Sequence, residues 1–214
     1  KRAIFRDAIL SRRTSDKDKQ VATNVGMFLE RFFVPRSYGY LTKTLRIYAA
    51  AGEANRANGI RNVAMSSDQP QIWNLARDMF RYFDECEWAD AMKRTTFLHL
   101  SDRMVNMGNV EVAEQVINES LEWAASKNDK IMRGFLLMSG SRLDRRRQDL
   151  YRARDRANEA LSIYKEADES NLTGEALAQL ALIELADGKS NSALKQAKLA
   201  EETANIPPVL ALCR

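Results

Sequence analysis

Three segments of this chain share one spacing between small residues. In each, a stretch with apolar residues at helical intervals ends in a glycine, and an alanine follows five positions later. An alanine permits the close approach of two antiparallel helices, because a larger side chain would hold their axes apart. The spacing therefore predicts repeated helix–turn–helix units. The residues concerned are Gly52 and Ala57, Gly108 and Ala113, and Gly188 and Ala193.

Helical periodicity also extends beyond these segments. The 214 residues are 45% hydrophobic and 29% charged, with 9 Gly and 4 Pro, which favours a sizeable core and long helices with few turns. No alternating segment is bounded by hairpin dipeptides, so strands are not expected. The sequence predicts an all-α fold of about ten helices with short connections, an α-solenoid of stacked antiparallel helix pairs.

The repeat units are placed by the glycine and alanine positions. We interpret the chain as one helical-repeat domain, with a further, degenerate unit in which an inserted arginine-rich stretch separates two helices. The domain covers residues 1–214, with N-terminal helices in 1–37, the best units at 38–67, 94–124 and 174–207, and the degenerate unit at 131–170.

These units resemble the tetratricopeptide repeat family, in which small residues occupy fixed positions and glycine closes the first helix. The resemblance implies a concave groove, lined by first helices, that holds a peptide, a helix or another protein. The starts at 38, 94 and 174 do not follow the family's period of about 34 residues, so we predict an irregular array. The family's carboxylate-gripping Lys and Asn are also missing. The matching positions hold Thr42, Arg46, Leu98, Asp102, Ala178 and Leu182.

Composition narrows the location and the class of the protein. No apolar run reaches the roughly 18 residues of a membrane-spanning helix, and charges interrupt the N-terminal apolar residues as no secretory signal allows. Cys86 and Cys213 lie far apart, which suits a reducing compartment, and we expect a cytoplasmic protein. Residues 1–68 carry 13 basic and 6 acidic side chains, a polarity that attracts acidic partners or nucleic acid.

No catalytic or metal-binding pattern is present in the sequence. His99 is the single histidine and lies within an apolar helical stretch, so it lacks the setting of a catalytic triad. The acidic residues between Asp84 and Asp90 lack the ligand spacing of a calcium loop, and no phosphate-binding glycine loop occurs. We therefore expect neither an enzyme nor a bound cofactor or metal.

The most distinctive charged feature is an arginine-rich segment between Arg142 and Arg156. Arginine forks match planar oxyanions, so this segment could contact phosphates or an acidic protein. Alternatively, its aspartates pair with the arginines to form a solvated, salt-bridged helix pair. On one helix, several of these arginines would share a broad face. The candidate partner-binding residues are Arg142, Arg145, Arg146, Arg147 and Arg152.

A dense aromatic group near the N-terminus supplies the other candidates. Phe33 and Tyr38 flank the bend predicted at Pro35, where exposed aromatic side chains would form a partner-binding patch. Together these features predict a protein–protein interaction module or scaffold that binds a partner protein or peptide. The alternative is a nucleic-acid-associated helical protein that uses the Arg142–Arg156 segment and the basic front.

Overall fold

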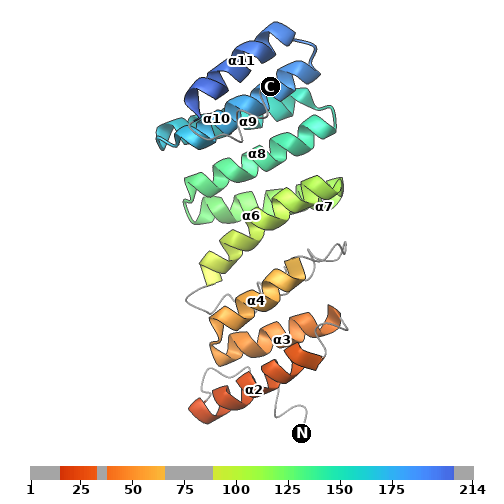
Figure 1. The fold of residues 1–214 in the computed structure, drawn as a ribbon, viewed down its shortest axis with the longest axis vertical. Helices are drawn as coiled ribbons and strands as arrows, with labels where there is room; N and C mark the ends of the chain where they lie inside the picture. The colour runs from red at the N-terminus through yellow and green to blue at the C-terminus, as the bar shows by residue number, and fades with distance from the viewer. Residues whose placement is uncertain (1–14, 33–37, 66–88, 205–214) are drawn as a thin grey trace. The chain divides into compact units, whose positions relative to one another are not determined.

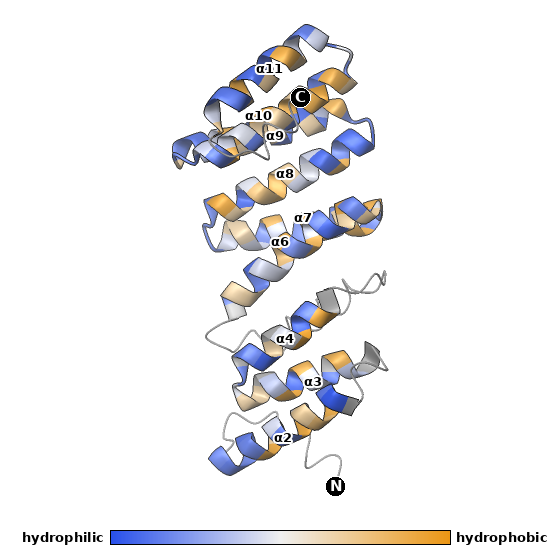
Figure 2. Ribbon diagram, viewed as in Figure 1, coloured by the Kyte–Doolittle hydropathy of each residue, from blue (hydrophilic) through white to orange (hydrophobic). Residues whose placement is uncertain are grey.

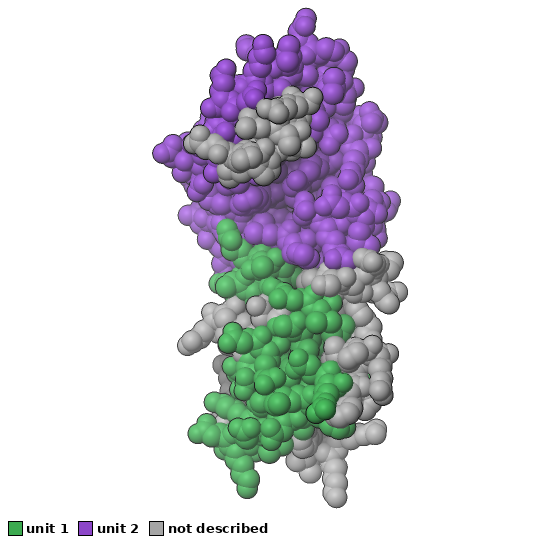
Figure 3. Space-filling view, in the orientation of Figure 1, with its two compact units in different colours: residues 1–96 green, residues 97–214 purple. Residues whose placement is uncertain are grey.

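The computed structural model describes residues 15–32, 38–65 and 89–204. The chain divides into two compact units, unit 1 (1–96) and unit 2 (97–214), coloured green and purple in Figure 3. Within the described ranges the secondary structure consists of nine α-helices and contains no strand. Neighbouring helices pack in pairs, so the predicted all-α, solenoid-like fold is confirmed.

Unit 1 contains α2 (Asp16–Phe32), α3 (Tyr38–Ala51) and α4 (Ala54–Met65), which pack in chain order. A fully buried tyrosine, Tyr48, joins the first two helices. Its ring covers Gly26 of α2, and its hydroxyl donates a hydrogen bond of 2.5 Å to Glu30 Oε2. Burial and the Glu30 carboxylate raise the pKa of Tyr48 to about 12, so the phenol stays protonated and keeps its donor role.

Unit 2 is a regular stack of helices, each connected to the next by a three-residue turn or shorter (Figure 1). Hydrophilic and hydrophobic residues both occur on the helices of the stack (Figure 2). α7 and α9 bury residues at helical spacing along one face, whereas α8 and α10 are buried around most of their circumference. The helices are α6 (Ala89–Met107), which begins in unit 1, α7 (Val110–Ser126), α8 (Lys130–Arg146), α9 (Leu150–Glu166), α10 (Ser170–Ala186) and α11 (Ser190–Thr203).

The turns of unit 2 recur every 20 residues. Each contains one residue with positive φ, followed by the N-cap residue of the next helix. Three N-cap side chains, those of Asn109, Asp129 and Asp149, accept hydrogen bonds from backbone N–H groups in the first turn of the following helix. The positive-φ residues are Gly108, Asn128, Gln148, Asp168 and Gly188.

Because the turns are evenly spaced, a helix pair repeats after 40 residues: α8 begins at Lys130 and α10 at Ser170. Buried alanines follow the same interval at Ala113, Ala153 and Ala193. The prediction of an irregular array is therefore wrong for unit 2. The mistake arose because Gln148 and Asp168 adopt positive φ without being glycine, which hid two of the turns.

The predicted insertion in the unit at 131–170 is also wrong. Only Arg147, Gln148 and Asp149 separate α8 from α9, so this connection is as short as its neighbours. The arginine-rich stretch is the end of one helix and the start of the next. Arg152 therefore lies on a different helix from Arg142, Arg145 and Arg146, and the four cannot share one helical face.

Two glycines let α9 lie close to α8. The Tyr164 ring covers Gly134, where an added Cβ would lie 2.5 Å from Tyr164 Cε1, and the Arg156 side chain covers Gly140. Next to Gly140, Ser141 Oγ donates a hydrogen bond of 2.8 Å to the Ala153 carbonyl oxygen. Tyr164 is 1% exposed and belongs to a core cluster with Leu137, so this approach buries the largest side chain of the pair.

Replacement of Gly134 by Ala should destabilise the chain by about 1–3 kcal/mol, because a ring enclosed by its neighbours cannot move away from the new methyl group. Gly59→Ala is the matched control. Nothing lies within 4 Å of its added Cβ, and a helical Gly→Ala change stabilises by about 1 kcal/mol. Urea unfolding of both variants checks the sign. A Gly134→Ala protein as stable as the wild type would contradict the close α8–α9 packing.

Candidate functional site: the arginine segment

The arginine-rich segment lies on the last turns of α8, the α8–α9 turn and the first half of α9. Most of its guanidinium groups connect one helix of unit 2 to another. Arg142 Nη2 lies 3.2 Å from Asp102 Oδ1, and Arg146 donates a hydrogen bond to the Val105 carbonyl oxygen. Both acceptors belong to α6, so these two arginines tie α8 to the helix two places before it.

The next arginines connect α7 with the α8–α9 turn. Arg147 Nη1 donates a hydrogen bond of 2.7 Å to Glu114 Oε2, and Arg152 Nη2 lies 3.6 Å from Glu114 Oε1. The Arg147 hydrogen bond lowers the pKa of the Glu114 carboxyl, which stays ionised. Arg147 and Glu114 are each about one-third exposed, so water screens much of their attraction.

The same bridge recurs 40 residues later with its charges reversed. Arg154 occupies the position of Glu114 in the repeat, and Asp187 occupies that of Arg147. Arg154 donates hydrogen bonds of 2.7 Å to both Asp187 and Glu184, which connect α9 to α10. Lys189 and Arg154 lower the pKa of Asp187. Successive repeats therefore use one geometry with opposite polarity.

Asp144 is the deepest charge in the segment. Its exposure is 0%, and neither carboxylate oxygen makes a hydrogen bond, although Arg156 Nη1 lies 3.0 Å from Oδ2. Burial raises the pKa of Asp144, and the attraction of Arg156 and Arg152 opposes that rise without cancelling it. Asp144 therefore holds Arg156 in place at a cost in desolvation.

Arg145 differs from the other arginines of the segment. Among the residues that the structure describes, it has no ion pair. Its Nε is buried without a hydrogen-bond partner, as is the Nε of Arg142. Burial, together with the neighbouring Arg146 and Arg142, lowers the pKa of Arg145. The structure therefore engages four of the five candidate arginines in intramolecular contacts and leaves one without an acceptor. Phe33 lies outside the described residues, as does the Tyr38 side chain.

Sequence reasoning missed several exposed apolar side chains of unit 2. Leu185 near the end of α10 is 59% exposed, and Leu194 on α11 is 57% exposed. Tyr151, at the start of α9, is 78% exposed. The sequence offered little signal for these residues, because leucines at helical spacing in α10 look the same whether they face the core or the solvent.

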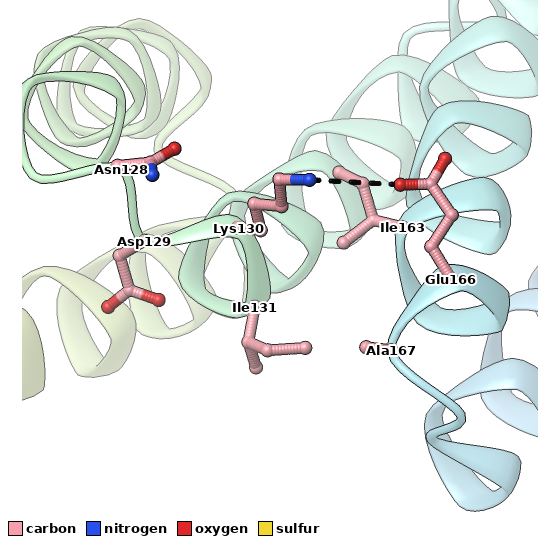
Figure 4. A pocket seen from close by; sticks show the side chains of 7 residues that line it. All are labelled: Asn128, Asp129, Lys130, Ile131, Ile163, Glu166 and Ala167. Atoms are coloured by element: carbon pink, nitrogen blue, oxygen red, sulfur yellow. Dashed lines mark ion pairs between the residues drawn. The ribbon is translucent and has the colours of Figure 1, made fainter.

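A shallow pocket of about 400 Å³ opens where α8 begins and α9 ends. In Figure 4, Ile131 and Ile163 point into it, and Lys130 reaches across its rim toward Glu166, at 3.9 Å. Both rim side chains are about two-thirds exposed. The pocket offers a small apolar floor and no group arranged for catalysis.

The sequence predicted no catalytic or metal centre, and the structure describes only some of the residues on which that prediction rests. His99 is exposed on α6, as is Asp90 near its start, whereas Cys86 and Cys213 lie outside the described ranges. Across 15–32, 38–65 and 89–204, no cluster of three His, Cys, Asp or Glu side chains is arranged to hold a metal ion. The helices in these ranges are also too short or too polar to cross a membrane.

Comparison with known proteins found no match: no family model, no curated protein and no solved structure resembles this chain significantly.

The two reversed bridges should each contribute a small coupling energy. In double-mutant cycles with glutamine, we expect about 0.5 kcal/mol for Glu114–Arg147 and a similar value for Arg154–Asp187. Lys130–Glu166 is the control, because both side chains are about two-thirds exposed and should show no measurable coupling. Urea unfolding at low salt measures all three. Zero coupling at both reversed bridges would show that these ion pairs do not connect the repeats.

The raised pKa of Asp144 predicts the sign of a pH effect. Between the pKa values of its unfolded and folded states, the folded protein binds more protons, so this group's contribution to stability falls as pH rises. The wild-type free energy of unfolding minus that of Asp144→Asn should therefore decrease as the pH rises above about 4, and then level off. Urea titrations at several pH values test this. A difference that grows with pH would show that Arg156 dominates and that the pKa is lowered.

Proposed function

We propose that the chain is a protein-interaction module that binds a partner protein or peptide through its helical-repeat surface. The observation that carries this proposal is an exposed leucine on a helix that is otherwise largely buried. Leu185, more than half exposed, lies on α10, whose other apolar residues Leu177, Leu180 and Ile183 are almost fully buried. A contiguous apolar patch marks a place where a partner docks, and we propose that Leu185 belongs to such a patch.

The repeat geometry supports a scaffold. Close helix contacts through Gly134 and Gly140 fix α8 against α9, so the surface is formed before binding and costs little entropy to present. A tetratricopeptide-like classification remains part of this proposal. The 40-residue interval of unit 2 is longer than the family's period of about 34, whereas its small residues at fixed positions favour the resemblance.

Nucleic-acid binding by the Arg142–Arg156 segment is the weaker alternative. Arg147, Arg152, Arg154 and Arg156 all pair with carboxylates of the same chain. A phosphate would have to compete with these carboxylates, although the segment itself carries seven arginines and three aspartates. The widely separated cysteines favour a cytoplasmic location, which we include in the proposal.

The proposed function is tested by affinity capture from a cell lysate on the immobilised chain, at low and high salt, with and without nuclease. We expect a defined protein to be retained after nuclease treatment and at high salt, because apolar contacts are not screened. Leu185→Lys should reduce its recovery severalfold, whereas Tyr151→Lys, on α9, should not.

Recovery of nucleic acid that is lost at high salt, with no retained protein, would contradict the interaction module and favour the alternative. If Leu185→Lys and the wild type recover the same amount of the lysate protein, the binding surface does not include Leu185 on α10. Circular dichroism of both lysine variants shows whether the fold is unchanged.

A further inference from the structure

The Arg145 side chain makes no ion pair or hydrogen bond with another described residue. Its Nε is buried, so this N–H group loses hydration that no acceptor of the described chain replaces. Arg142 and Arg146, on the same face of α8, both reach acceptors on α6, whereas Arg145 between them reaches none. An acceptor from outside the chain would offset this cost.

A hydrogen bond between α8 and α10 shows which part of α10 lies opposite Arg145. Gln179 Nε2 donates to Ser141 Oγ over 3.1 Å, which places these two residues opposite each other. Because α8 and α10 are both antiparallel to α9, they run in the same direction. Four residues beyond Ser141, Arg145 therefore lies opposite the last turn of α10. That turn begins at Ile183 and contains Leu185, which is 59% exposed, and Leu182, which is partly buried, directly precedes it.

We propose that Arg145 binds a carboxylate side chain of a partner protein's extended segment, and that Leu182 and Leu185 receive an apolar side chain of the same segment. This inference rests on the proposed function and names the chemistry of its partner. Packed helix axes lie about 8–10 Å apart, and an extended chain advances about 3.3 Å per residue. The acidic and apolar residues of the partner should therefore be about three positions apart.

A single carboxylate fits this surface better than a polyanion. Arg145 is the one described cation of the segment without an acceptor, so the surface offers one strong anion contact rather than a row of them. The Asp102 carboxylate, 3.2 Å from Arg142, would repel the neighbouring phosphates of a nucleic acid. The adjacent leucines also give no stacking surface for bases, whereas they suit an aliphatic or aromatic side chain.

The test uses three fluorescent peptides, blocked at both ends so that no terminal carboxylate is present: Gly-Ser-Glu-Ser-Ser-Leu-Gly-Ser, its Gln-for-Glu form and its Ser-for-Leu form. Each is titrated with the full chain at low salt, in parallel with an oligothymidine of similar length. The wild type should bind the Glu–Leu peptide about tenfold more tightly than the Gln form, as expected for a charged hydrogen bond. The Ser-for-Leu peptide should also bind more weakly.

Arg145→Gln should bind the Glu and Gln peptides equally, whereas the control Arg133→Gln, at the other end of α8 and paired with Glu159, should keep the tenfold difference.

The Arg145→Gln protein should melt at or above the wild-type temperature. The inference is overturned if the difference persists in Arg145→Gln, if no peptide binds, or if Arg145→Gln instead loses oligothymidine binding. The inference is also overturned if Arg145→Gln lowers the melting temperature as much as Arg156→Gln does, because Arg145 would then stabilise the fold. Retention of the same lysate protein by Arg145→Gln would refute this inference while leaving the interaction module intact.

Discussion

The architecture of unit 2 depends on how closely α9 approaches α8. Glycine at 134 and 140 removes two side chains from the interface, and alanine at 153 removes a third. Tyr164 and the stem of Arg156 fill the space against the α8 backbone. The Ser141 hydroxyl of one helix then donates a hydrogen bond to the Ala153 main-chain carbonyl of the other. The placement of α10, and of the surface it shares with α8, follows from this contact.

The order of the helices is fixed by their connections of two or three residues, so the ion pairs between repeats refine the stack and do not specify it. The Glu114–Arg147 and Arg154–Asp187 bridges occupy equivalent positions in successive repeats with opposite polarity. Each is worth little by itself, because water screens much of the attraction. Their reversal means that a helix of one repeat would meet a like charge at the equivalent position of the other, so each bridge fits its own neighbour.

Much of this fold could be predicted from the sequence, and the failures have physical causes. Glycine followed by a small residue five positions later correctly indicated the turns at Gly108 and Gly188, since glycine adopts positive φ without strain. The turns at Gln148 and Asp168 use the same conformation in residues that rarely adopt it. The 40-residue interval among Ala113, Ala153 and Ala193 could have revealed these turns, because burial of small residues recurs even where turn chemistry changes.

The candidate site was less predictable for a different reason. Whether an arginine forms an intramolecular ion pair depends on acids that are distant in sequence. The acids are Asp102 for Arg142, Glu114 for Arg147 and Glu184 for Arg154. No local pattern distinguishes Arg145 from these three. It becomes distinct only in the stacked helices, where those three arginines reach an acid and Arg145 does not. Because most arginines of this segment pair with acids on neighbouring helices, the proposed partner contact rests on the one described arginine of the segment that has no acceptor.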